Sequence, residues 1–185
     1  KVWKDLLNSK YKGKIAADDP RTGGSATPIF SGLLLAYGEP FMRDLQKNDI
    51  FFSTQRGVLD TGLTRGEYGM LTTALNQYHQ LARPGVPVKL IKFEDGVAVV
   101  PVYMYTFKGS PHPNGAKLWI DWALSEEGQK AVAEAGLVPV RKGITAKDPL
   151  DSLEGLKFLP RVDTPEMFAL INDRNKKYEE IYFKK

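Results

Sequence analysis

The chain contains no cysteine and only two histidines among its 185 residues. Without thiols it has no disulfide framework, no cysteine nucleophile and no thiolate metal site. Long hydrophobic runs are also missing. The apolar stretch Val97–Val102 has the length of a strand, whereas a membrane-spanning helix needs about 20 apolar residues. These absences favour a globular protein whose chemistry does not depend on sulfur.

The short motifs of nucleotide-binding proteins and of common hydrolases are absent as well. No G-x-x-x-x-G-K-[ST], G-x-G-x-x-G, G-x-S-x-G or H-E-x-x-H pattern occurs. The acid pairs Asp18-Asp19, Glu126-Glu127 and Glu179-Glu180 lie where turns or helix surfaces are expected, so they do not form an acid/base couple. We therefore expect no catalytic residues, no cofactor and no metal, and we do not expect an enzyme.

The composition is that of a folded protein. Hydrophobic residues make up 42% of the chain, enough for a core in one domain or two small ones. The net charge is +4, and the lysines and arginines are scattered among acidic residues. A nucleic-acid-binding protein more often carries a basic stripe with interleaved aromatic residues, so a nucleic-acid partner is not expected.

Hydrophobic periodicity predicts strands that alternate with helices between Lys14 and Phe93. The predicted strands are Lys14–Ala17, Ile50–Ser53, Met70–Ala74 and Val86–Phe93. Between them, helical patterns lie at Ile29–Tyr37, Gln55–Thr64 and Asn76–Ala82. Gly38 is expected to end the first of these helices, and Pro40 to open a short helix that runs through Leu45. This alternation is typical of an α/β fold with a parallel sheet.

Three further helices are predicted after the sheet. Apolar residues from Ala116 to Leu124 recur at helical spacing. Ser125 starts a second helix that ends at Gly136, and Thr164-Pro165 starts a third that runs toward the C-terminus.

The loop Asp18–Ser25 suggests ligand capture. It follows a predicted strand, contains two glycines and opens a helix, which leaves backbone N–H groups free to hold an anion. Ser25 or Thr27 can cap that helix. In parallel α/β sheets ligands bind at the carboxyl ends of strands. The loops Thr54–Arg56 and Thr73–Tyr78 also lie at such ends.

Several motifs in a fixed order resemble the extracellular solute-binding proteins of ABC importers. The resemblance is greatest to the ferric-ion-binding branch and its relatives that take phosphonates, thiamine or polyamines. It covers nearly the whole chain, and Pro111–Gln129 is its most specific part. The motifs are WxDLL at Trp3–Leu7, YKGKIAADDP at Tyr11–Pro20, TRGEY at Thr64–Tyr68, GVPVK at Gly85–Lys89 and PHPNGAKLWIDWALSEEGQK from Pro111.

The resemblance implies the type II periplasmic binding protein fold, in which two α/β lobes enclose the ligand. The chain corresponds to the C-terminal half of such a protein. Residues 1–100 and 144–185 are then expected to form the C-terminal lobe. Residues 101–143 are expected to belong to the N-terminal lobe, the rest of which is absent. Trp119, Ile120 and Trp122 would then lack part of their cover.

The resemblance also implies a ligand site. In ferric-binding relatives the loop that matches Thr22–Ser25 holds an anion, and polar ligands lie at the positions of Arg56 and Asn76. Arg56 can instead form a surface ion pair, and Asn76 can be a helix cap. The full predicted ligand-binding set is Arg21, Thr22, Gly23, Gly24, Ser25, Arg56, Thr73, Asn76 and Tyr78.

The sequence departs from the iron-binding pattern after the third strand. Ferric-binding relatives have two adjacent tyrosines there, whereas this chain has Tyr78 followed by His79. One phenolate and one imidazole are a poor ligand set for ferric iron. We therefore expect a small anionic or zwitterionic solute of phosphonate, phosphate ester or carboxylate type. Tyr78 would stack on it or pack in the hinge, and His79 is expected on a helix surface.

The resemblance implies a transport function. The protein would capture its solute by hinge closure and deliver it to an ABC permease in the membrane. It is expected to be periplasmic or extracellular, and monomeric at full length. One alternative is a ferric-ion-binding protein that uses Tyr78 with a synergistic anion. Another is the ligand-sensing domain of a regulator on the same fold.

Overall fold

Three short parallel strands form the sheet in the computed structural model, which describes residues 1–161 and 173–184. The strands β1 (Ile15–Asp18), β2 (Phe51–Ser53) and β3 (Met70–Leu71) lie in the order β2-β1-β3. The central strand β1 is the most buried of the three, because it is paired on both edges. The predicted parallel α/β sheet is therefore confirmed, with a third strand shorter than predicted.

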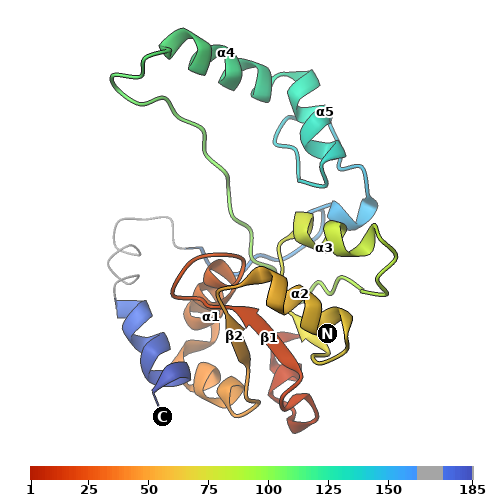
Figure 1. Cartoon of the computed structure of the whole chain (residues 1–185), viewed down its shortest axis with the longest axis vertical. Helices are drawn as coiled ribbons and strands as arrows, with labels where there is room; N and C mark the ends of the chain where they lie inside the picture. Colours follow the sequence, from red (N-terminus) through yellow and green to blue (C-terminus); the bar gives the residue numbers. More distant parts are fainter. Residues whose placement is uncertain (162–172, 185) are drawn as a thin grey trace.

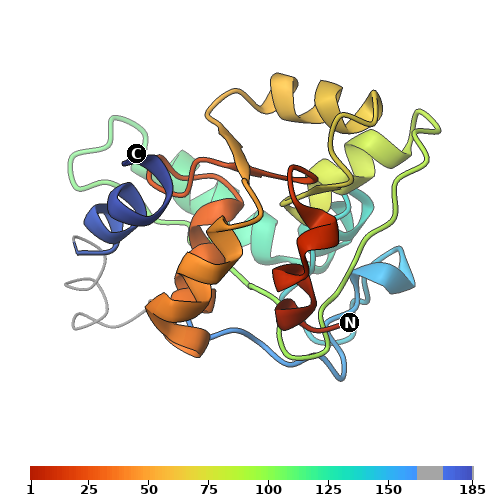
Figure 2. The ribbon, with the colours of Figure 1, turned by 90° about the horizontal axis from the view of Figure 1, so that it is seen from below.

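Two helices cover opposite faces of this sheet (Figure 2). Helix α1 (Ala26–Gln46) leads from β1 to β2, and α2 (Arg56–Thr64) leads from β2 past β1 to β3. The two crossovers run in opposite directions along the sheet. Because parallel crossovers are right-handed, opposite directions place the helices on opposite faces.

Helix α1 is kinked at Gly38. The φ angle of Gly38 is 76°, a conformation that other residues rarely adopt, and Pro40 opens the second part of the helix. The kink lets both parts of α1 bury their apolar side, with Phe30 and Leu33 before it and Met42 after it. The predicted break at Gly38 is thus confirmed.

Segments from both ends of the described chain complete the core on the α1 side of the sheet. The 3-10 helices η1 (Trp3–Leu7) and η2 (Ser9–Tyr11) precede β1. Residues 173–178 are helical and continue into the π-helical η4 (Glu179–Phe183), which packs on α1. The rings of Tyr178 and Tyr182 lie 6.3 and 5.6 Å from the ring of Phe30. The predicted helix start at Thr164-Pro165 lies outside the described residues.

Helix α3 (Leu75–Ala82) follows β3, as predicted. The predicted strand Val86–Phe93 is wrong, because this extended segment pairs with no strand among the described residues. The reason is geometric: a cavity separates it from the outer edge of β3. The following extended run is also largely unpaired. Within it, Val97 forms an isolated parallel bridge with Phe158.

Helices α4 (Pro113–Leu124) and α5 (Glu126–Glu134) stand apart from the sheet (Figure 1). An extended segment leads to α4, and the chain returns through the 3-10 helix η3 (Pro149–Asp151). The side chain of Ser125 caps α5 by accepting a hydrogen bond from the N–H of Gly128 at 3.2 Å. Gly136 follows with a φ of 77°. The predicted start and end of α5 are confirmed.

Large apolar side chains are exposed along residues 100–140. Trp119 is 61% exposed and Trp122 is 38% exposed, as expected if part of their cover lies outside this chain. The others in this stretch are Val100, Val102, Tyr103, Met104, Tyr105, Phe107, Leu118, Leu124, Leu137 and Val140. No helix in the described part of the chain has both the length and the apolarity needed to cross a membrane.

Candidate ligand-binding site

The three predicted loops meet at the carboxyl end of the sheet, and Arg56 connects them. Its side chain lies at the start of α2, just after β2. Nη2 donates a hydrogen bond to Thr73 Oγ1 at 2.9 Å, and Nη1 donates to the Thr72 carbonyl at 3.3 Å. Nε donates to Asp60 Oδ1 at 2.8 Å, one helical turn further along α2. The arginine thus holds the end of β3 against α2.

Asp18, the last residue of β1, joins the first loop to this arrangement. Its Oδ2 accepts a hydrogen bond from Ser25 Oγ at 2.6 Å and lies 3.5 Å from Arg56 Nη1. The sequence predicts Asp18 in a turn and does not mark it as a ligand-binding residue. The signal that would have found it is its place at the carboxyl end of the central strand. Ser25, Arg56 and Thr73 are therefore brought together around a residue that was not predicted.

The glycine loop is tightly built. Gly23 and Gly24 have φ angles of 116° and 71°, which other residues rarely adopt. A Cβ atom on Gly24 would lie 3.3 Å from the Cβ of Asp18, so the loop backbone rests directly on that aspartate. Thr27 Oγ1 donates to the carbonyl oxygens of Pro20 and Gly23 at 2.9 and 2.8 Å. These contacts hold the loop in place at the start of α1.

The predicted capping of α1 by Ser25 or Thr27 is wrong. Ser25 occupies the cap position, but its φ and ψ of −71° and −26° are already helical, and its hydroxyl is directed to Asp18 instead. Thr27 lies inside the first turn. Thr22 closes the loop from the other side, since its N–H and its hydroxyl both donate to the Asp19 carbonyl.

Arg21 does not join this group. Its guanidinium forms hydrogen bonds with Asp19 and with Glu179, and it lies 3.5 Å from the ring centroid of Phe183. Burial alone would raise the pKa of Asp19, but the hydrogen bonds and the positive charge of Arg21 outweigh it, and the pKa lies below its ordinary value of 3.8. Arg21 thus ties the loop to η4.

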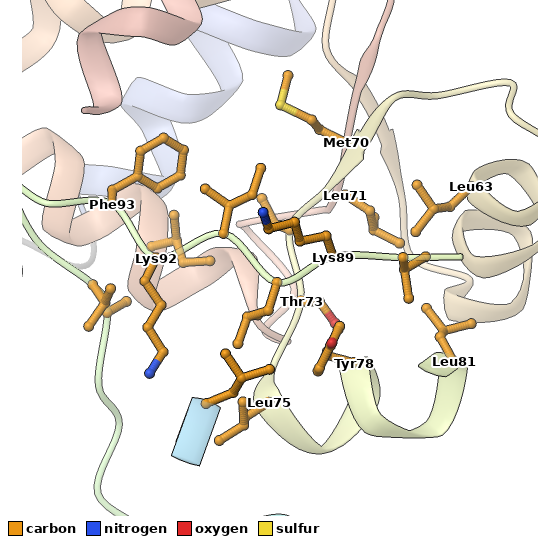
Figure 3. A pocket seen from close by; sticks show the side chains of 18 of the residues that line it. Leu63, Met70, Leu71, Thr73, Leu75, Tyr78, Leu81, Lys89, Lys92 and Phe93 are labelled. Carbon is orange, nitrogen blue, oxygen red and sulfur yellow. The ribbon is translucent and has the colours of Figure 1, made fainter. Parts of the chain in front are cut away.

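A largely apolar cavity of about 610 Å³ lies beside these loops (Figure 3). The end of β3, helix α3 and the extended segment 86–93 surround it. Thr73 lines the cavity and also accepts the hydrogen bond from Arg56, so it belongs to both the polar group and the cavity. Thr72 Oγ1 is buried at the same place and has no hydrogen-bond partner among the described residues. Polar and apolar surfaces thus meet at the end of β3.

Helix α3 contributes Asn76 and Tyr78. Tyr78 lines the cavity, whereas Asn76 is half-buried on the first turn. The expectation for His79 was wrong. Its side chain is only 14% exposed, and Nε2 lies 2.8 Å from Oδ1 of the buried Asp151 in η3. Gly136 packs on the imidazole ring, where any Cβ would lie 2.7 Å from His79 Cδ2. His79 therefore anchors α3 to the segment that returns from α5.

A comparison with known protein families identifies the family of this chain. Residues 1–161 match the family model described as bacterial extracellular solute-binding protein. The chain belongs to this family. The solute-binding proteins similar to it are not enzymes, in agreement with the sequence analysis.

Similar proteins share the fold of this solute-binding chain. It is 25% identical over 157 residues to a putative 2-aminoethylphosphonate-binding periplasmic protein of Salmonella typhimurium. That alignment covers 79% of this chain and 47% of the relative. The periplasmic binding protein AfuA from Actinobacillus pleuropneumoniae, solved with bound fructose-6-phosphate, superposes with a TM-score of 0.73 at 23% identity. That alignment covers 98% of this chain and 60% of AfuA.

Iron-bound HitA from Pseudomonas aeruginosa has the same fold, with a TM-score of 0.64 at 20% identity over 97% of this chain and 60% of HitA. The predicted periplasmic binding protein fold of the ferric-binding type is therefore confirmed. The solute-binding chain spans about half the length of its curated relative and 60% of these two structures.

Proposed function

We propose that this chain is part of the substrate-binding component of an ABC importer and captures a small anionic or zwitterionic solute of phosphonate, phosphate ester or carboxylate type. The observation that carries the proposal is the convergence of Ser25, Asp18, Arg56 and Thr73 where three strands of one parallel sheet end. Loops at this edge are where α/β sheets bind ligands. The first contacts of the solute are then Thr22–Ser25 and Thr73, which Arg56 holds in place, with Tyr78 at the cavity and Asn76 beside it on the first turn of α3.

The names of two similar proteins support this class of solute. One is named for a phosphonate and the other was solved with a sugar phosphate. Both ligands present a tetrahedral oxyanion, which suits backbone N–H groups and hydroxyls at the start of a helix. The loop Thr22–Ser25 at the start of α1 offers that chemistry, with two glycines that bring its backbone close to a ligand.

The proposed role implies a division into two lobes, closure of the lobes around the solute and docking on a permease. Residues 1–100 and 144–185 would form the C-terminal lobe. Residues 101–143 would belong to the other lobe, where the remainder of that lobe would cover their exposed apolar side chains. Closure of the two lobes would bury the solute, and the closed form would dock on a permease in the membrane. In this role we expect the protein to act in the periplasm or outside the cell, and to be monomeric at full length.

Ferric iron is the alternative solute, because iron-bound HitA has the same fold as this chain. It would need Tyr78 and a synergistic anion on the Thr22–Ser25 loop. His79 offers little help, because its Nε2 is held by both carboxylate oxygens of Asp151. A single phenolate is a weak protein ligand set for ferric iron, so an organic solute is better supported.

A thermal-shift screen of the full-length protein tests the proposal. The panel contains phosphonates, phosphate esters, phosphate, small carboxylates and ferric citrate. A ligand at about a thousand times its Kd adds about 4 kcal/mol of stability, which is a shift of several degrees. We expect a shift with one organic anion or zwitterion, and Arg56→Ala should remove it. A shift with ferric citrate alone would establish the iron alternative and overturn the proposal.

A further inference from the structure

The polar group at the carboxyl end of the sheet carries an excess of negative charge. Two carboxylates, Asp18 and Asp60, face the single guanidinium of Arg56. None of the three side chains is more than 30% exposed, so solvent screens their charges only partly. A solute that brought only negative charge to this place would add to an existing imbalance.

Arg56 cannot bind an incoming anion without losing some of its present hydrogen bonds. Its Nε is bonded to Asp60, its Nη1 to the Thr72 carbonyl and its Nη2 to Thr73 Oγ1. A fork-like contact with an incoming anion, which the sequence alone suggested, would have to displace one of these partners. The hydroxyls of Thr22 and Ser25 already donate to Asp19 and Asp18, so the anion-binding groups that remain are the backbone N–H groups of Gly23, Gly24 and Ser25.

That loop rests on a carboxylate. Ser25 Oγ donates to Asp18 at 2.6 Å, and the backbone of Gly24 lies in contact with the same side chain. An oxyanion bound on the loop therefore lies next to Asp18, which repels it. A cationic group on the same solute removes this repulsion and offsets the excess charge of the two carboxylates.

We propose that the solute is a zwitterion, with its oxyanion on the Thr22–Ser25 loop and its ammonium group bound by Asp18. This assignment rests on the proposed function and narrows its substrate class. Asp18 then determines specificity: it selects solutes that carry a cation a few atoms from the oxyanion and rejects plain anions. Asp60 has a different part, since its contact is with Arg56 and it does not touch the loop.

The test is calorimetric titration of the full-length protein with matched probes. The probes are aminoalkylphosphonates with two or three carbons and the alkylphosphonates of the same chain lengths, which lack only the amine. We expect the amino compounds to bind about 10- to 100-fold more tightly, the usual gain from a hydrogen bond to a charged group. In Asp18→Asn this preference should disappear, with weaker binding of the amino compound and equal or tighter binding of the plain one.

The two probes should respond in opposite directions to Asp18→Asn. This distinguishes the loss of ammonium recognition from a misfolded site, which would weaken the binding of both probes. Asp60→Asn is the comparison variant: it removes one charge of the excess without touching the loop, so it should reduce the preference less than Asp18→Asn does. Equal affinity of the two probes in the unsubstituted protein would overturn the assignment of Asp18 and leave the proposed function standing. A preference that persists in Asp18→Asn would overturn it as well. Binding of neither phosphonate, with a thermal shift from ferric citrate alone, would overturn both proposals.

Discussion

His79 Nε2 lies within 2.9 Å of both carboxylate oxygens of Asp151, a side chain that is only 1% exposed. The contact joins α3, next to the candidate site, to η3 on the segment that returns from α4 and α5. His79 is therefore a structural connection between two regions that are 72 positions apart in the sequence.

We expect His79→Ala to lower the free energy of unfolding by about 2–5 kcal/mol, because it leaves the carboxylate of Asp151 buried without its partner. Urea denaturation measures this change. The matched control is His112→Ala at the other histidine, which is exposed at the start of α4 and should change stability by less than about 0.5 kcal/mol. Equal effects of the two substitutions would contradict the structural role of His79.

Asp19 should make stability depend on pH at the acid end. Its pKa in the folded protein lies below the ordinary value of 3.8, so folding favours the ionised form. The stabilisation is present above pH 3.8 and is lost as the pH falls through the lower folded pKa. The stability advantage of the unsubstituted protein over Asp19→Asn should therefore shrink below pH 3.8. A difference that stays constant down to pH 2 would refute this.

Gly38 and Gly57 should respond in opposite ways to alanine. Gly38 has a φ of 76° at the kink in α1, so Gly38→Ala should lower stability by about 1 kcal/mol or more. Gly57 lies in helix α2 with open space around its Cα, so Gly57→Ala should raise stability by about 0.5–1 kcal/mol. Thermal unfolding of both variants checks the pair. A stabilising Gly38→Ala would show that α1 is straight at this position.

Tryptophan fluorescence should report the exposed face of α4. Trp119 and Trp122 are exposed in this chain, whereas Trp3 is 7% exposed and stacks on Phe93 with ring centroids 3.9 Å apart. Acrylamide should quench the unsubstituted chain strongly and a Trp119→Phe/Trp122→Phe variant weakly. In the full-length protein the two should differ less, if the proposed second lobe covers α4. An unchanged difference at full length would argue against that assignment of residues 101–143.

The helices and the glycine loop could be predicted because their signals are local. The break at Gly38, the cap at Ser125 and the end at Gly136 depend on residues a few positions apart, and all three were found. Local signals could not show whether Val86–Phe93 forms a strand. Its alternating pattern is real, but a strand also needs a partner at its edge, and a cavity lies where the partner would be.

The geometry of the candidate site could be predicted in part for the same reason. Loops at strand ends follow from the order of elements, so Ser25, Arg56 and Thr73 were placed correctly near one another. The partners of charged side chains do not follow from that order. Arg21 meets Glu179 across 158 positions, and no local pattern indicates that this contact holds Arg21 toward η4 and away from Arg56.

The packing of Phe30 against Tyr178 and Tyr182 has a consequence for the order in which the chain folds. A ribosome that has released the sheet and α1 has not yet released the aromatic rings that cover them. Until residues 178–182 emerge, the apolar side of α1 stays exposed to water, and Arg21 lacks its partner Glu179 in η4. Native packing of this unit therefore follows the synthesis of residues 178–182, well after the sheet and α1 have been made.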